Sequence, residues 1–180
     1  MKTYLGIDLG GTNVRVAKVT RDGIVLAGVK RPSLAQEGPR RVMDNIMEMI
    51  REIPGYTECE GIGVGVPGPV DTLNGKMLMA TNLPGFERYP IAAELSQNFN
   101  MPAYVDNDAN VAGLAEALVG AGKGLPVVYY VTISTGIGGA LVVDGKVVSG
   151  KHGHAGEIAN IIIDRNREKI NHLNIGAVEN

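Results

Sequence analysis

The sequence predicts an α/β protein with mixed sheets, built from two related lobes of which the second is incomplete. Three strands, expected at residues 4–8, 13–20 and 24–30, follow one another too closely for helical crossovers, so they form an antiparallel meander. Helices and strands then alternate as helix, strand, helix, strand, helix. Near residue 127 the opening order of strand, glycine-rich turn, strand, Asp-Gly turn and strand begins again, which indicates the second lobe.

The remaining elements follow from periodicity and from turn residues. Apolar residues from Val42 to Ile50 recur at three- and four-residue spacing after Gly38-Pro39, which predicts an amphipathic helix that Pro54-Gly55 ends. The apolar stretch at 61–66 predicts a strand, and Asp144-Gly145 predicts a hairpin turn. The expected elements are strands at 61–66, 103–106 and 127–133, helices at 90–98 and 109–119, a turn at 71–76, a loop at 81–85, and a hairpin of 139–143 with 146–148.

The composition is that of an ordinary globular chain. Of its 180 residues 44% are apolar and 20% are charged, and the net charge is −2. This balance lacks the basic excess of nucleic-acid binders, so we expect no nucleic-acid partner. The sequence has neither an apolar run of membrane length nor a signal-peptide pattern, so we expect a cytoplasmic protein without membrane contact. The lone cysteine, Cys59, excludes an internal disulfide framework.

The stretch Asp8-Leu9-Gly10-Gly11-Thr12 follows the first strand. Glycines let backbone N–H groups approach a phosphate closely, a threonine hydroxyl adds a donor, and an aspartate can hold Mg²⁺ or its waters. The stretch is equally compatible with a glycine-rich hairpin turn that binds nothing. A second cluster, Ser134–Gly139, ends the strand at 127–133 in the corresponding place. The pair predicts two turns that hold one polyphosphate, with a coincidence of two hairpin turns as the alternative.

Two further stretches carry carboxylates. In Asp106-Asn107-Asp108-Ala109-Asn110, a carboxylate where a strand meets a helix could accept a proton from a sugar hydroxyl. A single aspartate there is also a common helix N-cap, but this stretch holds more polar groups than a cap requires. In Gly153-His154-Ala155-Gly156-Glu157, the glutamate could accept hydrogen bonds from sugar hydroxyls or could be a solvated loop acid.

Together with "GVGVPGPVD" at 63–71, "TNLPGF" at 81–86 and "STGIGGALV" at 134–142, these stretches resemble the ROK family of sugar kinases and repressors. The family belongs to the superfamily of sugar kinases, Hsp70 and actin, and the resemblance covers essentially the whole chain. It implies actin-like ATPase (ribonuclease H-like) lobes. The N-terminal lobe, 1–115, would carry the first phosphate turn and the sugar loops, and 116–180 would begin the C-terminal lobe.

The resemblance implies ATP-dependent phosphorylation of a hexose at its 6-hydroxyl, as in carbohydrate metabolism and glycolysis, with Asp108 as the catalytic base. "TNLPGF" looks like glucose kinases, so glucose is the expected sugar. The implied sugar-binding residues are Gly65, Pro67, Gly68, Asn82, Asn107, Asp108, Glu157, Asn160 and Glu179. The implied residues for ATP are Asp8, Gly10, Gly11, Thr12, Asn13, Thr135, Gly136 and Gly138, and Asp8 would hold Mg²⁺ through water.

One departure from the family concerns zinc. The family's zinc knuckle uses one histidine and three cysteines, and its four positions fall here on Asn160, Ile170, His172 and Ala177. A structural zinc site needs about four N or S ligands, so we expect no zinc. Asn160 also replaces a histidine that typically contacts the sugar, although an asparagine can still make a hydrogen bond there.

A second departure concerns length, because the chain ends just after Glu179 without the glycine-rich adenosine segment of the family. We therefore expect a fragment or truncated form of a kinase, rather than a natural short paralogue, and such a form can be inactive alone. The alternatives are a kinase for N-acetylmannosamine, fructose or another hexose, and a catalytically silent sugar-binding module. A repressor is disfavoured because only seven residues precede Asp8 and no basic patch is present. Family kinases are often homodimers.

Overall fold

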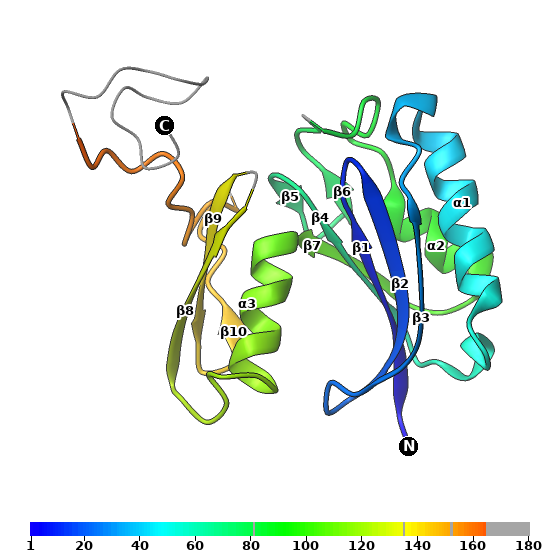
Figure 1. Ribbon diagram of the computed structural model, residues 1–180, viewed down its shortest axis with the longest axis horizontal. Coiled ribbons are helices and arrows are strands. Elements are labelled where there is room, and N and C mark those ends of the chain that lie inside the picture. The colour runs from blue at the N-terminus through cyan, green and yellow to red at the C-terminus, as the bar shows by residue number, and fades with distance from the viewer. Residues whose placement is uncertain (81, 135, 152, 165–180) are drawn as a thin grey trace. The chain divides into compact units, whose positions relative to one another are not determined.

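The computed structural model describes residues 1–80, 82–134, 136–151 and 153–164. The chain divides into two compact units, the first ending at Asp108 and the second starting at Ala109 (Figure 1). This division lies at the start of a helix that the sequence predicts. The functional division into lobes 1–115 and 116–180 stays a prediction.

The first unit is organised around a five-stranded sheet in the order β3-β2-β1-β4-β7. Strands β1 (Thr3–Leu9), β2 (Asn13–Thr20) and β3 (Val25–Pro32) form the expected antiparallel meander. Strands β4 (Ile62–Val66) and β7 (Ala103–Asn107) run parallel to β1. The carboxyl ends of β1, β4 and β7 therefore meet at one edge, which is where open α/β sheets bind ligands.

Two helices of the first unit, α1 (Pro39–Glu52) and α2 (Ile91–Phe99), lie on the same face of this sheet (Figure 1). Proline suits the first turn of α1 because its missing N–H is not needed there. Every second residue of β1 and β2 is buried, and so is the predicted stripe of α1. The resulting core includes Leu5, Ile7, Leu9, Val14, Val16, Val42, Met43, Ile46, Met49 and Ile50.

Short elements complete the first unit. The sequence predicts only a turn at 71–76, whereas the structure places two short strands at its ends, β5 (Val70–Asp71) and β6 (Lys76–Met77). Asp71 closes this turn by accepting hydrogen bonds from the side chain and the backbone N–H of Asn74, and these bonds lower the pKa of the Asp71 carboxyl. Two single 3-10 turns, η1 (Ala35–Glu37) and η2 (Tyr56–Glu58), flank α1.

The second unit holds most of helix α3 (Asp108–Leu118) and an antiparallel sheet in the order β10-β9-β8. Its strands are β8 (Val127–Ile133), β9 (Ile137–Val143) and β10 (Lys146–Val147). This meander repeats the order of β1-β2-β3, as the sequence predicts. Strand β9 begins two residues before the expected Gly139, because Ile133 pairs with Ile137 across a very short turn. None of the described helices is both long and apolar enough to cross a membrane.

Candidate active site

A cross-strand row at the carboxyl edge of the first sheet brings two carboxylates onto one face. Gly65 on β4 pairs with Asp8 on β1 and with Asp106 on β7. Residues in register on neighbouring strands point to the same face, and strands lie about 4.8 Å apart, so the two aspartates lie about 10 Å apart. Gly65 leaves the face between them without a side chain. The row therefore places two carboxylates on one face, on either side of a buried glycine.

Asp8 also faces a cation across the meander. Its Oδ2 lies 2.6 Å from Nη1 of Arg15, its partner in the register of β1 and β2. The Asp8 side chain remains 53% exposed, so a hydrated ion can reach it. A Mg²⁺ ion held through water, as the resemblance implies, would share this carboxylate with Arg15. Asp8 therefore fits the role of a residue that binds Mg²⁺ through the water molecules around the ion.

The first glycine turn lies against a loop that the sequence assigns to the sugar. The N–H of Gly10 donates to the carbonyl of Asn13 (2.9 Å) and so closes the turn. A Cβ on Gly11 would lie 2.8 Å from the backbone oxygen of Asn82. Such a contact is sterically excluded, so Gly11 lets the turn meet the loop that begins at Asn82. The structure thus brings together a residue assigned to phosphate and one assigned to the sugar.

The end of β7 is tied to the Pro67-Gly68 segment. The Asn107 side chain is buried, and its Nδ2 donates to the Gly68 carbonyl (3.1 Å). Gly68 has a φ of +81°, which favours glycine, and its segment follows β4 directly. The sugar residues assigned at 65–68 and Asn107 therefore gather at the same sheet edge.

Asp108 follows at once as the first residue of α3, and it is exposed. A carboxylate in the first turn of a helix is stabilised by the helix dipole, so the position of Asp108 also suits a purely structural role. An exposed carboxylate is also what a base needs to reach the hydroxyl of a substrate. The role of Asp108 as base stays a prediction.

In the second unit, Glu157 lies beside the second glycine segment. A Cβ on Gly138 would lie 3.5 Å from the Ala109 Cβ and 3.9 Å from Oε2 of Glu157. Ala109 is bonded to Asp108 in the chain. Gly138 thus lies next to the residue that follows the candidate base and next to a candidate sugar ligand.

The loop that carries Glu157 is fixed to β8 and β9. The hydroxyl of Tyr129 donates to the carbonyl of Gly156 (2.7 Å), and a Cβ on Gly139 would lie 2.4 Å from the same oxygen. Gly156 has a φ of +93°. Its close approach to β9 therefore depends on two glycines and one tyrosine hydroxyl.

Some expected site residues are not tested by the structure. Thr135 and Glu179 lie outside the described residues, as do the knuckle positions Ile170, His172 and Ala177. Asn160 is described and is exposed. Among the residues that the structure does describe, no group of three or more His, Cys, Asp or Glu is arranged for a metal ion. The expectation of no zinc stays a prediction.

Three residues that shape the site were not predicted from the sequence: Arg15, Ser33 and Tyr129. Arg15 could have been found from the strand register opposite Asp8, because alternation in a hairpin places the two on one face. Ser33 and Tyr129 contact glycine segments distant in sequence, and no local pattern marks either of them.

The ROK family is matched over residues 4–172. This chain belongs to the ROK family. It is 33% identical over 175 residues to a glucokinase from Thermotoga maritima, covering 97% of the chain and 55% of that protein. It is also 33% identical over 159 residues to an N-acetyl-D-glucosamine kinase from Shigella flexneri, with coverages of 88% and 52%. A xylose repressor from Caldicellulosiruptor bescii is 30% identical over 183 residues, with coverages of 99% and 46%.

Solved structures agree with this assignment. The ROK hexokinase from Thermus thermophilus has a TM-score of 0.85 at 32% identity, over 98% of this chain and 59% of that one. A ROK glucokinase from Streptomyces griseus, in complex with glucose and AMPPNP, has a TM-score of 0.82 at 28% identity, over 98% and 56%. The expected fold, mixed α/β of the actin-like type, is confirmed. This ROK chain spans about half the length of the curated relatives it matches.

Proposed function

We propose that this ROK protein acts in the ATP-dependent phosphorylation of a hexose at its 6-hydroxyl, with glucose as the preferred sugar. The observation that carries the proposal is the contact of Gly11 with Asn82, which joins a phosphate-type turn to a sugar-type loop. Both lie in the first unit, where the carboxyl ends of the parallel strands meet.

In this proposal Asp108 takes the proton of the 6-hydroxyl. The sugar oxygen then forms a bond to the γ-phosphorus of ATP, and the bond from that phosphorus to the bridging oxygen breaks, so that ADP leaves with the electron pair. Mg²⁺, held through water by Asp8, would neutralise phosphate charge. Backbone amides and hydroxyls of the two turns would bind the phosphates, through Gly10, Gly11, Thr12, Asn13, Thr135, Gly136 and Gly138.

The sugar would be held by groups at the ends of the strands and in two loops. Asn107 is fixed by its hydrogen bond to Gly68, and Glu157 by the anchoring of its loop to β9. Fixed donors and acceptors of this kind orient a hydroxyl for transfer. Asn82, Asn160 and Glu179 would complete the contacts.

Glucose is preferred because "TNLPGF" resembles glucose kinases and because two of the similar proteins are glucokinases. An N-acetyl-D-glucosamine kinase and a protein described as a putative N-acetylmannosamine kinase are also similar, and fructose is a further alternative. An assay of ADP release tests the proposal across these four sugars. We expect the highest kcat/KM with glucose, and no ADP release above background with any hexose would refute a kinase activity of the protein tested.

A further inference from the structure

Ser33, the residue after β3, directs both of its polar groups at the first glycine turn. Its hydroxyl donates to the carbonyl of Gly11 (2.7 Å), and its N–H donates to the carbonyl of Thr12 (2.9 Å). The residue is only 1% exposed, so water does not compete for these bonds. One buried serine therefore holds two consecutive carbonyls of the turn.

Holding the carbonyls also orients the amides. In a trans peptide the N–H of one residue points opposite to the carbonyl of the residue before it, and the described residues contain no cis peptide. The carbonyl of Gly11 points at Ser33, so the N–H of Thr12 points away from Ser33. A turn that binds phosphate needs its N–H groups fixed in this way, because they must point at the ligand rather than into the protein.

The opposite side of the turn is held by the loop that begins at Asn82. The contact of Gly11 with the Asn82 backbone leaves no room for a Cβ. The turn is therefore held between Ser33 and this loop. Without the Ser33 hydroxyl, the turn would lose its hydrogen bond at the Gly11 carbonyl, while its contact with the Asn82 backbone would remain.

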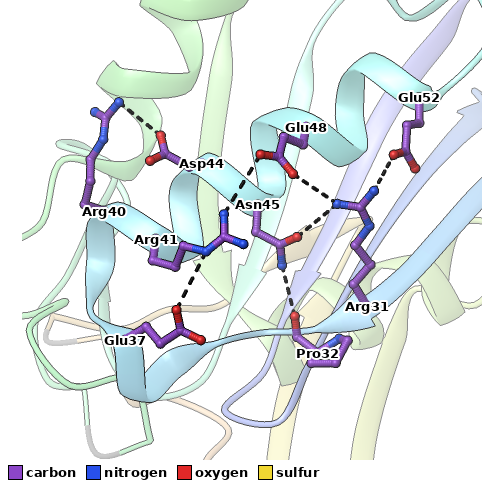
Figure 2. A network of polar contacts seen from close by, with 9 residues as sticks. All are labelled: Arg31, Pro32, Glu37, Arg40, Arg41, Asp44, Asn45, Glu48 and Glu52. Atoms are coloured by element: carbon purple, nitrogen blue, oxygen red, sulfur yellow. Dashed lines mark hydrogen bonds and ion pairs between the residues drawn. The ribbon is translucent and has the colours of Figure 1, made fainter.

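Ser33 is fixed in turn by helix α1 through the two residues before it. The buried Asn45 donates from Nδ2 to the carbonyl of Pro32 (2.9 Å) and accepts at Oδ1 from Nη1 of Arg31 (3.2 Å), as Figure 2 shows. Arg31 also forms ion pairs with Glu48 and Glu52 on the same helix. The segment that carries Ser33 is thereby fastened to the most buried helix of the unit.

We propose that Ser33 is a positioning residue for the phosphate turn: it sets the orientation of the Thr12 amide for the phosphates of ATP. The inference rests on the proposed function. Ser33 itself lies behind the turn, so it acts through Gly11 and Thr12 and makes no contact with nucleotide.

The test compares Ser33→Ala and Ser33→Cys, which lack the strong donor, with Ser33→Thr, which keeps a hydroxyl, and with Ser96→Ala as the control. Ser96 lies on α2 of the same unit and is partly buried. We expect Ser33→Ala and Ser33→Cys to speed amide hydrogen exchange in residues 10–13 by about fivefold to tenfold, the equivalent of one lost hydrogen bond. Exchange in α1 should not change, and Ser33→Thr and Ser96→Ala should match the unchanged protein.

In the kinase assay the same two variants should raise the KM for ATP·Mg²⁺ by a similar factor, with the KM for glucose within about twofold. Unchanged exchange at residues 10–13 in both variants would overturn the proposal, and so would an equal rise of both KM values. Failure of the unchanged protein to transfer phosphate would refute the proposed function instead. The exchange measurement needs no activity, so the two failures are distinguishable.

Discussion

Gly11 serves two purposes at the scale of a single residue. It belongs to the turn that we assign to phosphate, and its missing side chain lets the Asn82 backbone come close. A glycine in such a motif is commonly explained by the approach of a ligand alone. Here the protein's own backbone already requires it.

Gly11→Ala should therefore destabilise the protein even without nucleotide. The new Cβ would meet backbone atoms, which cannot swing aside as a flexible side chain can. We expect a loss of about 1–3 kcal/mol in the free energy of unfolding, measured by urea denaturation. Gly6→Ala is the matched control, because a Cβ at that position of β1 meets nothing within 4 Å. Equal stability of the two variants would contradict the packing role of Gly11.

Asp108 is the second residue whose role can be isolated. Asp108→Asn keeps the shape of the side chain but removes its ability to accept a proton, so we expect kcat for ADP release to fall by about 10²–10⁴-fold. The KM for glucose should change little. Asp22→Asn, in the exposed turn between β2 and β3, is the control. If Asp108→Asn kept kcat within twofold, Asp108 would have a structural role at the start of α3 instead.

At the scale of elements, the second unit depends on close contact between β9 and the loop at 153–157. Gly139 and Gly156 allow the two backbones to approach, and the Tyr129 hydroxyl bonds to the carbonyl of Gly156. Glu157 follows directly. The position of this candidate sugar ligand is therefore set by strands β8 and β9 together with its own loop, in which the Glu157 N–H donates to the carbonyl of His154 (3.2 Å).

Tyr129→Phe removes the bond and keeps the ring. Because the Tyr129 side chain is half exposed, we expect a modest loss of about 0.5–1.5 kcal/mol, seen as a two- to tenfold weaker Kd for glucose in calorimetry. Tyr130→Phe, on the same strand, should bind glucose like the unchanged protein. An unaltered Kd for Tyr129→Phe would show that Glu157 does not depend on this anchor.

Most elements could be predicted because their signals are local. The stripe of α1 was predicted from the spacing of its apolar residues, and the meander was predicted from the short connections between its three strands. The start of β9 and the ribbon of β5 and β6 were missed. Both are decided by pairing across a turn, in which the partner strand rather than the local composition sets the bounds.

At the scale of the whole molecule, the question is which member of the ROK family this chain represents. Its relatives include sugar kinases and xylose repressors, and it spans about half the length of those it matches. We expect the 180-residue chain to bind glucose in calorimetry, because the sugar-type residues at 65–68, 82 and 107 lie in its first unit. No detectable heat with glucose or with the other three hexoses would contradict this expectation.

Assays of the same purified chain distinguish a kinase, a catalytically silent sugar-binding module and a repressor. ADP release with glucose supports the kinase, whereas glucose binding without ADP release supports the catalytically silent module. Sugar-dependent retention of duplex DNA in a gel-shift assay would indicate a repressor and contradict the expectation of no nucleic-acid partner. A binding-deficient control is Asn107→Ala, which removes the fixed amide at the sheet edge.

The sequence by itself determined the family, the order of the elements and the residue types of the site, because motifs, periodicity and turn residues are written in consecutive positions. It identified Asp8, Gly11, Asn82, Asn107 and Glu157 as separate candidates. Only the tertiary structure decided which of them meet: Asp8 shares a strand row with Gly65, Gly11 packs on Asn82, and Ser33 holds the turn from behind. These contacts join residues far apart in the chain, and their partners are fixed by strand register and backbone packing, which no local pattern encodes.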